Sequence, residues 1–155
     1  MLGACKEAPK GEEKTEPVAE EQTVEYKNSF PYRGIPQELV MKVWNEVDML
    51  DYIFHQLPFS MNQTEQASIR TNVSYIGKNA KPWIPKDCVP IARQFYQTNG
   101  DIWMEADVYF TEQCQFYVFY IDGKPAYANE MSTAGSDFFK TMINQALDAS
   151  KKAGH

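Results

Sequence analysis

The residues best suited to chemistry in this sequence are Trp103, Glu105, Asp107 and Tyr109, within the stretch IWMEADVYF. They alternate with apolar residues, so a β-strand would project all four to one side of a sheet. Two carboxylates at positions i and i+2 of a strand lie about 7 Å apart. Paired carboxylates between aromatic rings are what glycoside hydrolases use, and aromatic faces also stack on sugars. The predicted face therefore suits either glycan hydrolysis, with Glu105 and Asp107 as acid and base, or the binding of a glycan, peptide or protein.

A plainer interpretation of the same face stays open. Alternation turns polar residues outward on any half-covered sheet, and Arg93 or Lys124 would then pair with the two acids across strands. If the face does bind a partner, neighbouring strands would add side chains, namely Tyr117 or Tyr120, and Tyr127. Because the sequence has no GxSxG motif and no glycine-rich phosphate loop, we expect a protein that is not an enzyme.

Two of the three cysteines, Cys88 and Cys114, are 26 residues apart. In an oxidising compartment they would be free to pair, tying the loop before the first strand of a sheet to the turn before the third. A bridge that closes a loop of this length contributes about 3.5 kcal/mol. The alternative is two buried thiols, or a redox or catalytic cysteine, although neither stands in a CxxC motif.

The remaining cysteine, Cys5, follows Leu2, Gly3 and Ala4. The stretch LGAC resembles the lipobox of bacterial lipoproteins, in which the cysteine becomes the mature N-terminus. The resemblance implies that Cys5 is linked to diacylglycerol and that residues 1–4 are the remnant of a signal peptide. Two acyl chains are enough for stable membrane anchoring.

The same resemblance implies a location in the bacterial cell envelope, facing the periplasm or the cell surface. Lys6 rather than Asp follows the cysteine, which favours the outer membrane by the sorting rule of many Gram-negative bacteria. A signal peptide also needs a basic and an apolar segment ahead of the lipobox. We therefore expect either that the natural reading frame begins upstream of Met1 or that this segment was removed. A cytosolic interaction protein with an acidic tail is the alternative.

Composition limits the other partners. The net charge is -6 and the 15 basic residues are scattered, which argues against a nucleic-acid surface. His55 and His155 are the only histidines, and the sequence has no cluster of His, Cys and carboxylate ligands, so we expect neither a metal nor another cofactor. The expected partners are the membrane, through Cys5, and an envelope protein, peptide or glycan.

The sequence divides into a tether and one domain. Residues 6–29 hold seven Glu and four Lys and few apolar side chains, too few to offset the entropy of ordering. We predict that residues 5–29 form a disordered acidic tether, whose r.m.s. reach as a flexible coil is about 25 to 30 Å. Within it, residues 23–26 alternate weakly and would suit an edge strand. The domain spans residues 30–150, and residues 151–155 form a disordered tail.

The first half of the domain has helical spacing. Apolar residues recur every three or four positions behind Pro36, and Pro58 would end this first helix. Asn62 and Glu65 fit a capping box that opens a second helix, with Gly77 as its C-cap. These features predict a helical hairpin. Residues 78–90 would form a proline-containing loop to the sheet.

The second half has the alternation of strands. We predict four strands with turns at Asn99-Gly100, TEQC and Asp122-Gly123, followed by a helix that begins at Ser132 or Thr133 and ends near Ala149. The strands are expected at residues 91–97, 102–110, 115–121 and 125–131. The predicted fold is thus α+β: an N-terminal helical hairpin, a four-stranded antiparallel meander, and a C-terminal helix packed on one face of the sheet.

Overall fold

The fold is α+β, with three helices and one antiparallel sheet of seven strands in the order β2-β1-β4-β5-β6-β7-β3. The computed structural model describes residues 23–58 and 60–153. The helices are α1 (Gln37–Glu46), α2 (Gln66–Val73) and α3 (Thr133–Ala153). The strands are β1 (Met49–Phe54), β2 (Ser60–Gln63), β3 (Ile76–Ala80), β4 (Ala92–Thr98), β5 (Asp101–Phe110), β6 (Gln115–Ile121) and β7 (Lys124–Met131). Within these described residues, none of the helices has both the length and the apolar character that crossing a bilayer requires.

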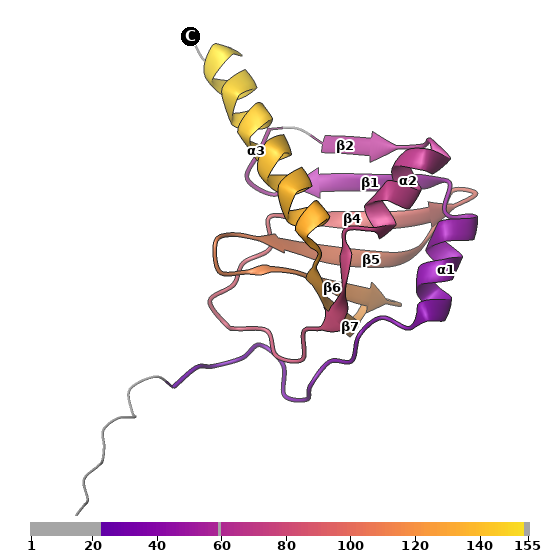
Figure 1. The fold of residues 1–155 in the computed structure, drawn as a ribbon, viewed down its shortest axis with the longest axis vertical. Helices are drawn as coiled ribbons and strands as arrows, with labels where there is room; N and C mark the ends of the chain where they lie inside the picture. Colours follow the sequence, from indigo (N-terminus) through magenta and orange to yellow (C-terminus); the bar gives the residue numbers. More distant parts are fainter. Residues whose placement is uncertain (1–22, 59, 154–155) are drawn as a thin grey trace, which may run out of the picture.

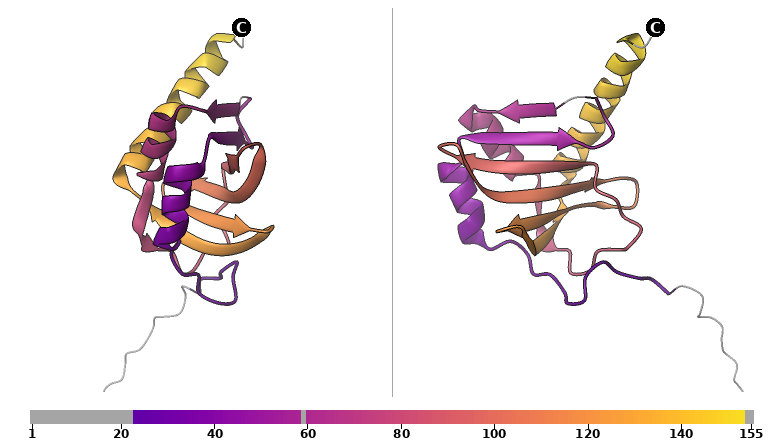
Figure 2. Two further views of the ribbon diagram at one scale, coloured as in Figure 1. Left: turned by 90° about the vertical axis from the view of Figure 1, so that its right-hand side faces the viewer. Right: turned by 180° about the vertical axis from the view of Figure 1, so that it is seen from behind.

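All three helices pack on one face of the sheet, which we call the helix face (Figures 1 and 2). The main core lies between the two layers. It includes Val43 of α1, Ile69 of α2 and Phe139 of α3, packed against Leu50 and Met104 of the sheet. This burial of apolar side chains holds the helices to the sheet.

Helix α3 begins where the sequence predicts. The Ser132 hydroxyl accepts a hydrogen bond from the Gly135 amide at 3.1 Å, as an N-cap side chain does. The ring of Phe139 is fully buried and lies within 6.5 Å, between ring centroids, of five other aromatic rings. The C-terminal part of α3 continues past the edge of the sheet beside β2 (Figure 1). The described helix reaches Ala153, which includes the first residues of the predicted tail.

The predicted helical hairpin is wrong. Helix α1 ends at Glu46, and residues 49–54 form β1. Leu50 and Phe54, four residues apart, fit a helical stripe, but Leu50, Tyr52 and Phe54 also alternate, and all three are buried. The residues form a strand rather than a helix because β1 pairs with β4 on one side and with β2 on the other. In this strand the side chains of Leu50, Tyr52 and Phe54 are buried under the helices.

Helix α2 is shorter at both ends than the predicted second helix. Asn62 lies in β2, and Glu65 precedes α2 without any side-chain capping bond, so the predicted capping box does not form. Gly77 lies in β3 rather than at a C-cap. A Cβ at Gly77 would clash with the carbonyl group of Glu130 on β7, so glycine allows the two strands to approach closely there.

The four-stranded meander is also wrong as a description of the sheet. Strands β4 to β7 form close to their predicted positions, but β1 and β2 extend the sheet beyond β4, and β3 extends it beyond β7. The three added strands come from residues predicted as helix or loop. They widen the surface on the side opposite the helices, which we call the outer face.

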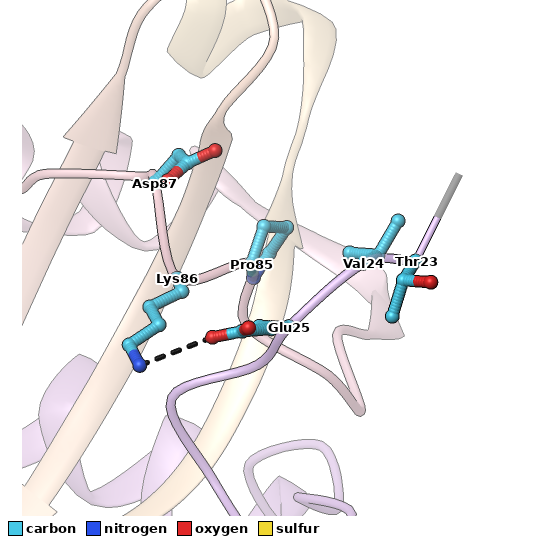
Figure 3. A pocket seen from close by; sticks show the side chains of 6 residues that line it. All are labelled: Thr23, Val24, Glu25, Pro85, Lys86 and Asp87. Atoms are coloured by element: carbon cyan, nitrogen blue, oxygen red, sulfur yellow. Dashed lines mark hydrogen bonds and ion pairs between the residues drawn. The ribbon is translucent and has the colours of Figure 1, made fainter. Parts of the chain in front are cut away.

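One half of the outer face is covered by two segments, residues 23–34, called the arm, and residues 81–90, called the loop. The Lys27 amide donates to the Ile84 carbonyl and the Lys86 amide to the Glu25 carbonyl, each at 2.8 Å. The Lys86 ammonium group also pairs with the Glu25 carboxylate at 3.1 Å (Figure 3). Residues 23–29, assigned to the tether from sequence, thus lie along the loop. Residues 23–26 contribute a single bridge, between Tyr26 and Pro85, and no edge strand.

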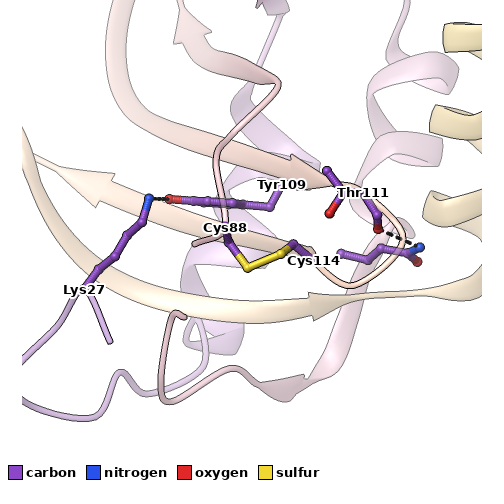
Figure 4. The surroundings of a disulfide bond; sticks show 6 residues. Lys27, Cys88, Tyr109, Thr111 and Cys114 are labelled. Carbon is purple, nitrogen blue, oxygen red and sulfur yellow. Dashed lines mark hydrogen bonds between the residues drawn. A yellow bond between two sulfur atoms is a disulfide. The ribbon is translucent and has the colours of Figure 1, made fainter. Parts of the chain in front are cut away.

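A disulfide between Cys88 and Cys114 fastens the loop to the turn between β5 and β6 (Figure 4). The two Cα atoms are 5.9 Å apart. Both cysteines belong to a second buried cluster on the outer face, with Ile84 of the loop and Tyr109 and Phe116 of the sheet. The predicted bridge is confirmed, and it indicates a compartment that is not the reducing cytosol.

Candidate functional site

The two carboxylates predicted as a site lie on the outer face and bind one guanidinium group, that of Arg93 on β4. Arg93 stands directly across from Asp107 of β5. Its Nε and Nη2 atoms are each 2.9 Å from Asp107 Oδ1, and its Nη1 is 2.9 Å from Glu105 Oε1. The cross-strand pairing proposed for Arg93 from sequence is therefore present.

Tyr120 of β6 completes this group. Its hydroxyl donates to Asp107 Oδ2 at 2.9 Å, and the Arg93 guanidinium lies 4.3 Å from the centre of its ring. Both oxygens of the buried Asp107 therefore have partners. Burial, followed by the charge of Asp107, raises the pKa of Tyr120 to about 12. Partial burial lowers the pKa of Arg93, but the hydrogen bond to Asp107 and the charges of Asp107 and its neighbours together more than offset it, so this pKa lies above its ordinary value.

This geometry favours a structural role for the two acids over hydrolysis. A glycosidase keeps its two carboxylates on either side of a sugar bond, with room between them for the substrate or water. Here Arg93 binds both Glu105 and Asp107 and neutralises charge that a catalytic pair would need. The group is a cross-strand ion pair with an added hydrogen bond, and it links the outer sides of β4, β5 and β6.

Trp103 does not share the side of Glu105 and Asp107. The register between β4 and β5 shifts after Tyr96, which pairs with Met104, while Gln97 pairs with Ile102. Trp103 is the extra residue of this bulge, and a bulge disrupts the alternation of side chains. Its ring packs at the main core on the helix face, beneath the Lys42 ammonium group, which is 4.3 Å from the ring centre.

Tyr109 does lie on the outer face, but the arm and the loop cover it. Its ring stacks on Phe116 with centroids 4.5 Å apart, and Lys27 of the arm donates to its hydroxyl at 3.3 Å (Figure 4). Burial, and then the charge of Asp107, raise its pKa. Of the three tyrosines proposed as contributors, Tyr117 and Tyr127 face the main core, and only Tyr120 joins the outer face.

The uncovered half of the outer face lies on the neighbouring strands β1, β4, β5 and β6, which face the viewer in the rear view of Figure 2. We call it the open face and define it by six residues: Ile53, Arg93, Phe95, Ile102, Glu105 and Tyr120. Ile53 pairs with Arg93, and Phe95 pairs with Glu105, so apolar and charged side chains alternate across the strands. Ile53 and Ile102 are each half exposed.

A groove beneath α3 is a second concave surface, which the sequence did not predict. Two adjoining depressions, of about 570 and 650 Å³, share Met61 of β2 with Met142 and Gln145 of α3. Tyr75 and Phe138 line the inner end of the groove. The signal for it was present in the apolar face predicted for α3, but its opposite wall is β2, whose residues were expected to form the turn between two helices and the start of the second.

Cys5, the predicted lipidation site, lies outside the described residues. Comparison of the chain with models of protein families, with curated proteins and with solved structures gave no match.

Proposed function

We propose that this protein is a membrane-anchored lipoprotein of the bacterial cell envelope whose α+β domain binds another envelope protein and is not an enzyme. The anchor rests on the match of residues 2–5 to a lipobox. The disulfide supports an extracytosolic location, because such bonds persist where thiols are not kept reduced. The buried bridge is also consistent with a domain that folds after export.

The open face is the observation that carries the binding role. It combines Arg93, Tyr120 and Phe95 with two half-exposed isoleucines, and arginine and aromatic residues are the types most enriched in the centres of protein interfaces. Its ion pairs are already formed within the domain, so docking does not require them to reorganise. A partner with apolar side chains opposite Ile53 and Ile102 would cover this surface.

Site-specific photocrosslinking in living cells tests this proposal. A photoreactive amino acid at Ile102 should yield a discrete protein adduct in the envelope fraction. The matched control is the same amino acid at Glu38, an exposed position on α1 of the helix face, which should yield none. A third position, Ala149, reports on the groove beneath α3. An adduct from Glu38 or Ala149 but none from Ile102 would contradict the open face as the binding surface.

A further inference from the structure

Four exposed apolar side chains lie on the arm and the loop, near the beginning of the described chain, and we call them the exit patch. They are Val24, Tyr26 and Phe30 of the arm and Trp83 of the loop, with exposed fractions of 53%, 44%, 80% and 37%. Tyr26 and Trp83 contact each other, with ring centroids 5.5 Å apart. Large apolar side chains clustered at the surface mark sites of interaction.

The exit patch is held in place rather than left loose. Besides the backbone bonds to the loop, the side-chain amide of Asn28 donates through Nδ2 to the backbone carbonyls of Phe30 and Pro82 at 2.7 and 2.8 Å. The side-chain oxygen of Asn28, Oδ1, accepts a hydrogen bond from the backbone amide of Ile84 at 3.0 Å. Beneath these segments the disulfide fixes the loop to the sheet. Little further ordering would be needed for the patch to bind a surface.

The arm and the loop, which carry the exit patch, differ in charge from the chain as a whole. The arm and the loop together carry four basic residues and only two acidic ones, whereas the whole chain has a net charge of -6. The basic residues are Lys27, Arg33, Lys81 and Lys86, and the acidic ones are Glu25 and Asp87. A local excess of positive charge beside aromatic rings matches the surface of a bilayer that contains anionic lipids.

The position of the patch fits the same partner. Thr23 and the C-terminus of α3 lie at opposite ends of the molecule (Figure 1). Thr23, Val24 and Glu25 also line a depression of about 460 Å³ with Pro85, Lys86 and Asp87 (Figure 3). The chain between Cys5 and Thr23 can span at most about 60 Å. An acyl group on Cys5 would therefore keep the exit patch close to the membrane at a high effective concentration.

We propose that the exit patch docks on the anionic bilayer to which the chain is anchored, with Tyr26 and Trp83 at the boundary between headgroups and acyl chains. This inference rests on the proposed lipid anchor. In the docked orientation the arm and the loop face the membrane, and the far end of α3 points away from it. The domain would then present its binding surfaces in a fixed direction instead of tumbling on its tether.

A reconstituted anchor tests the docking without depending on lipidation in cells. Because Cys88 and Cys114 are bridged, the full chain can be coupled through the thiol of Cys5 to a maleimide phospholipid in vesicles of phosphatidylcholine with a minority of phosphatidylglycerol. Brominated lipids should then quench tryptophan emission. The quenching should be lost in Trp83→Phe and retained in Trp44→Phe, whose altered residue lies on α1 away from the patch.

A charge variant gives a second readout on the untethered protein. Removing one cation near an anionic bilayer costs about 1 kcal/mol, so Lys86→Gln should weaken vesicle binding roughly fivefold. The control, Lys124→Gln, removes an exposed lysine outside the patch and should bind as the wild type does. Absence of quenching in the tethered protein, or a dimer that Trp83→Asp dissociates, would overturn the inference. An unmodified Cys5 in cells would instead overturn only the proposed function, since the vesicle result would still stand.

Discussion

Replacing Cys88 and Cys114 together by alanine should lower the free energy of unfolding by about 3.5 kcal/mol. The bridge closes a loop of 26 residues, and its removal returns that loop entropy to the unfolded chain. The loss should be concentrated where the bridge acts. Amides that bond the arm to the loop should exchange with solvent faster, because these bonds depend on the position of the loop. They include the amide of Lys27, which donates to the Ile84 carbonyl, and that of Ile84, which donates to Asn28 Oδ1.

Denaturant unfolding and amide hydrogen exchange measure the two effects. The comparison is made in a Cys5→Ser background, so that no third thiol can form a wrong bridge, and Cys5→Ser alone serves as the control with unchanged stability. Faster exchange spread evenly through α3 and the main core would contradict a local role for the bridge. A loss of stability below about 1 kcal/mol would contradict its assignment as a main constraint on this half of the sheet.

Replacing Arg93 by methionine should destabilise the domain by about 2 to 3 kcal/mol. The change leaves the buried carboxylate of Asp107 with Tyr120 as its described partner and without a counter-ion. The expected loss is no larger than the lower end of the range for fully buried ion pairs, because the side chains of Arg93 and Glu105 are each 30% exposed.

A double variant separates the ion pair from general damage to the strand. Adding Asp107→Asn removes the isolated charge, so Arg93→Met/Asp107→Asn should be more stable than Arg93→Met alone. Glu105→Gln, which removes the more exposed partner, should cost less than about 1 kcal/mol. If the double variant is less stable than Arg93→Met by the full cost of Asp107→Asn, the two residues are not coupled and the described pair contributes nothing.

The first half of the fold was mispredicted because local spacing there fits two structures. Leu50 and Phe54 satisfy the four-residue spacing of a helix, and with Tyr52 they also satisfy the alternation of a strand. Only pairing with β4, some 40 residues later in the chain, favours the strand. Sequence spacing carries no information about such a distant partner, and the same limit hid β3, which pairs with β7. Strand β2 pairs with its neighbour β1 and was missed together with it.

The second half was predictable because each strand is long and its turns have strong signals. Asn99 and Gly100, and Asp122 and Gly123, adopt the positive φ angles that two-residue hairpin turns need. The pairing of Arg93 with the two acids also followed from alternation. The bulge at Trp103 did not, since one extra residue changes the side of the strand without any mark in the apolar pattern.

The candidate site changed for a related reason. Tyr109 was expected to be exposed beside Asp107, but residues 23–34 fold back over it, although their first part was assigned to a tether by composition. Composition averages over many residues, whereas Tyr26 and Asn28 make specific contacts with the loop. The predicted disulfide was correct because residues 30–150 contain two cysteines, Cys88 and Cys114, which leave one possible bridge within the domain.

The mass of the mature protein tests the central claim, that the chain is anchored through Cys5. The protein should be expressed in a Gram-negative bacterium with its natural upstream region, extracted from membranes and measured intact. We expect an N-terminus at Cys5 that carries a diacylglyceryl group, and a bridged Cys88–Cys114 pair in the same molecule. Recovery from the soluble fraction with residues 1–4 retained and Cys5 unmodified would contradict it.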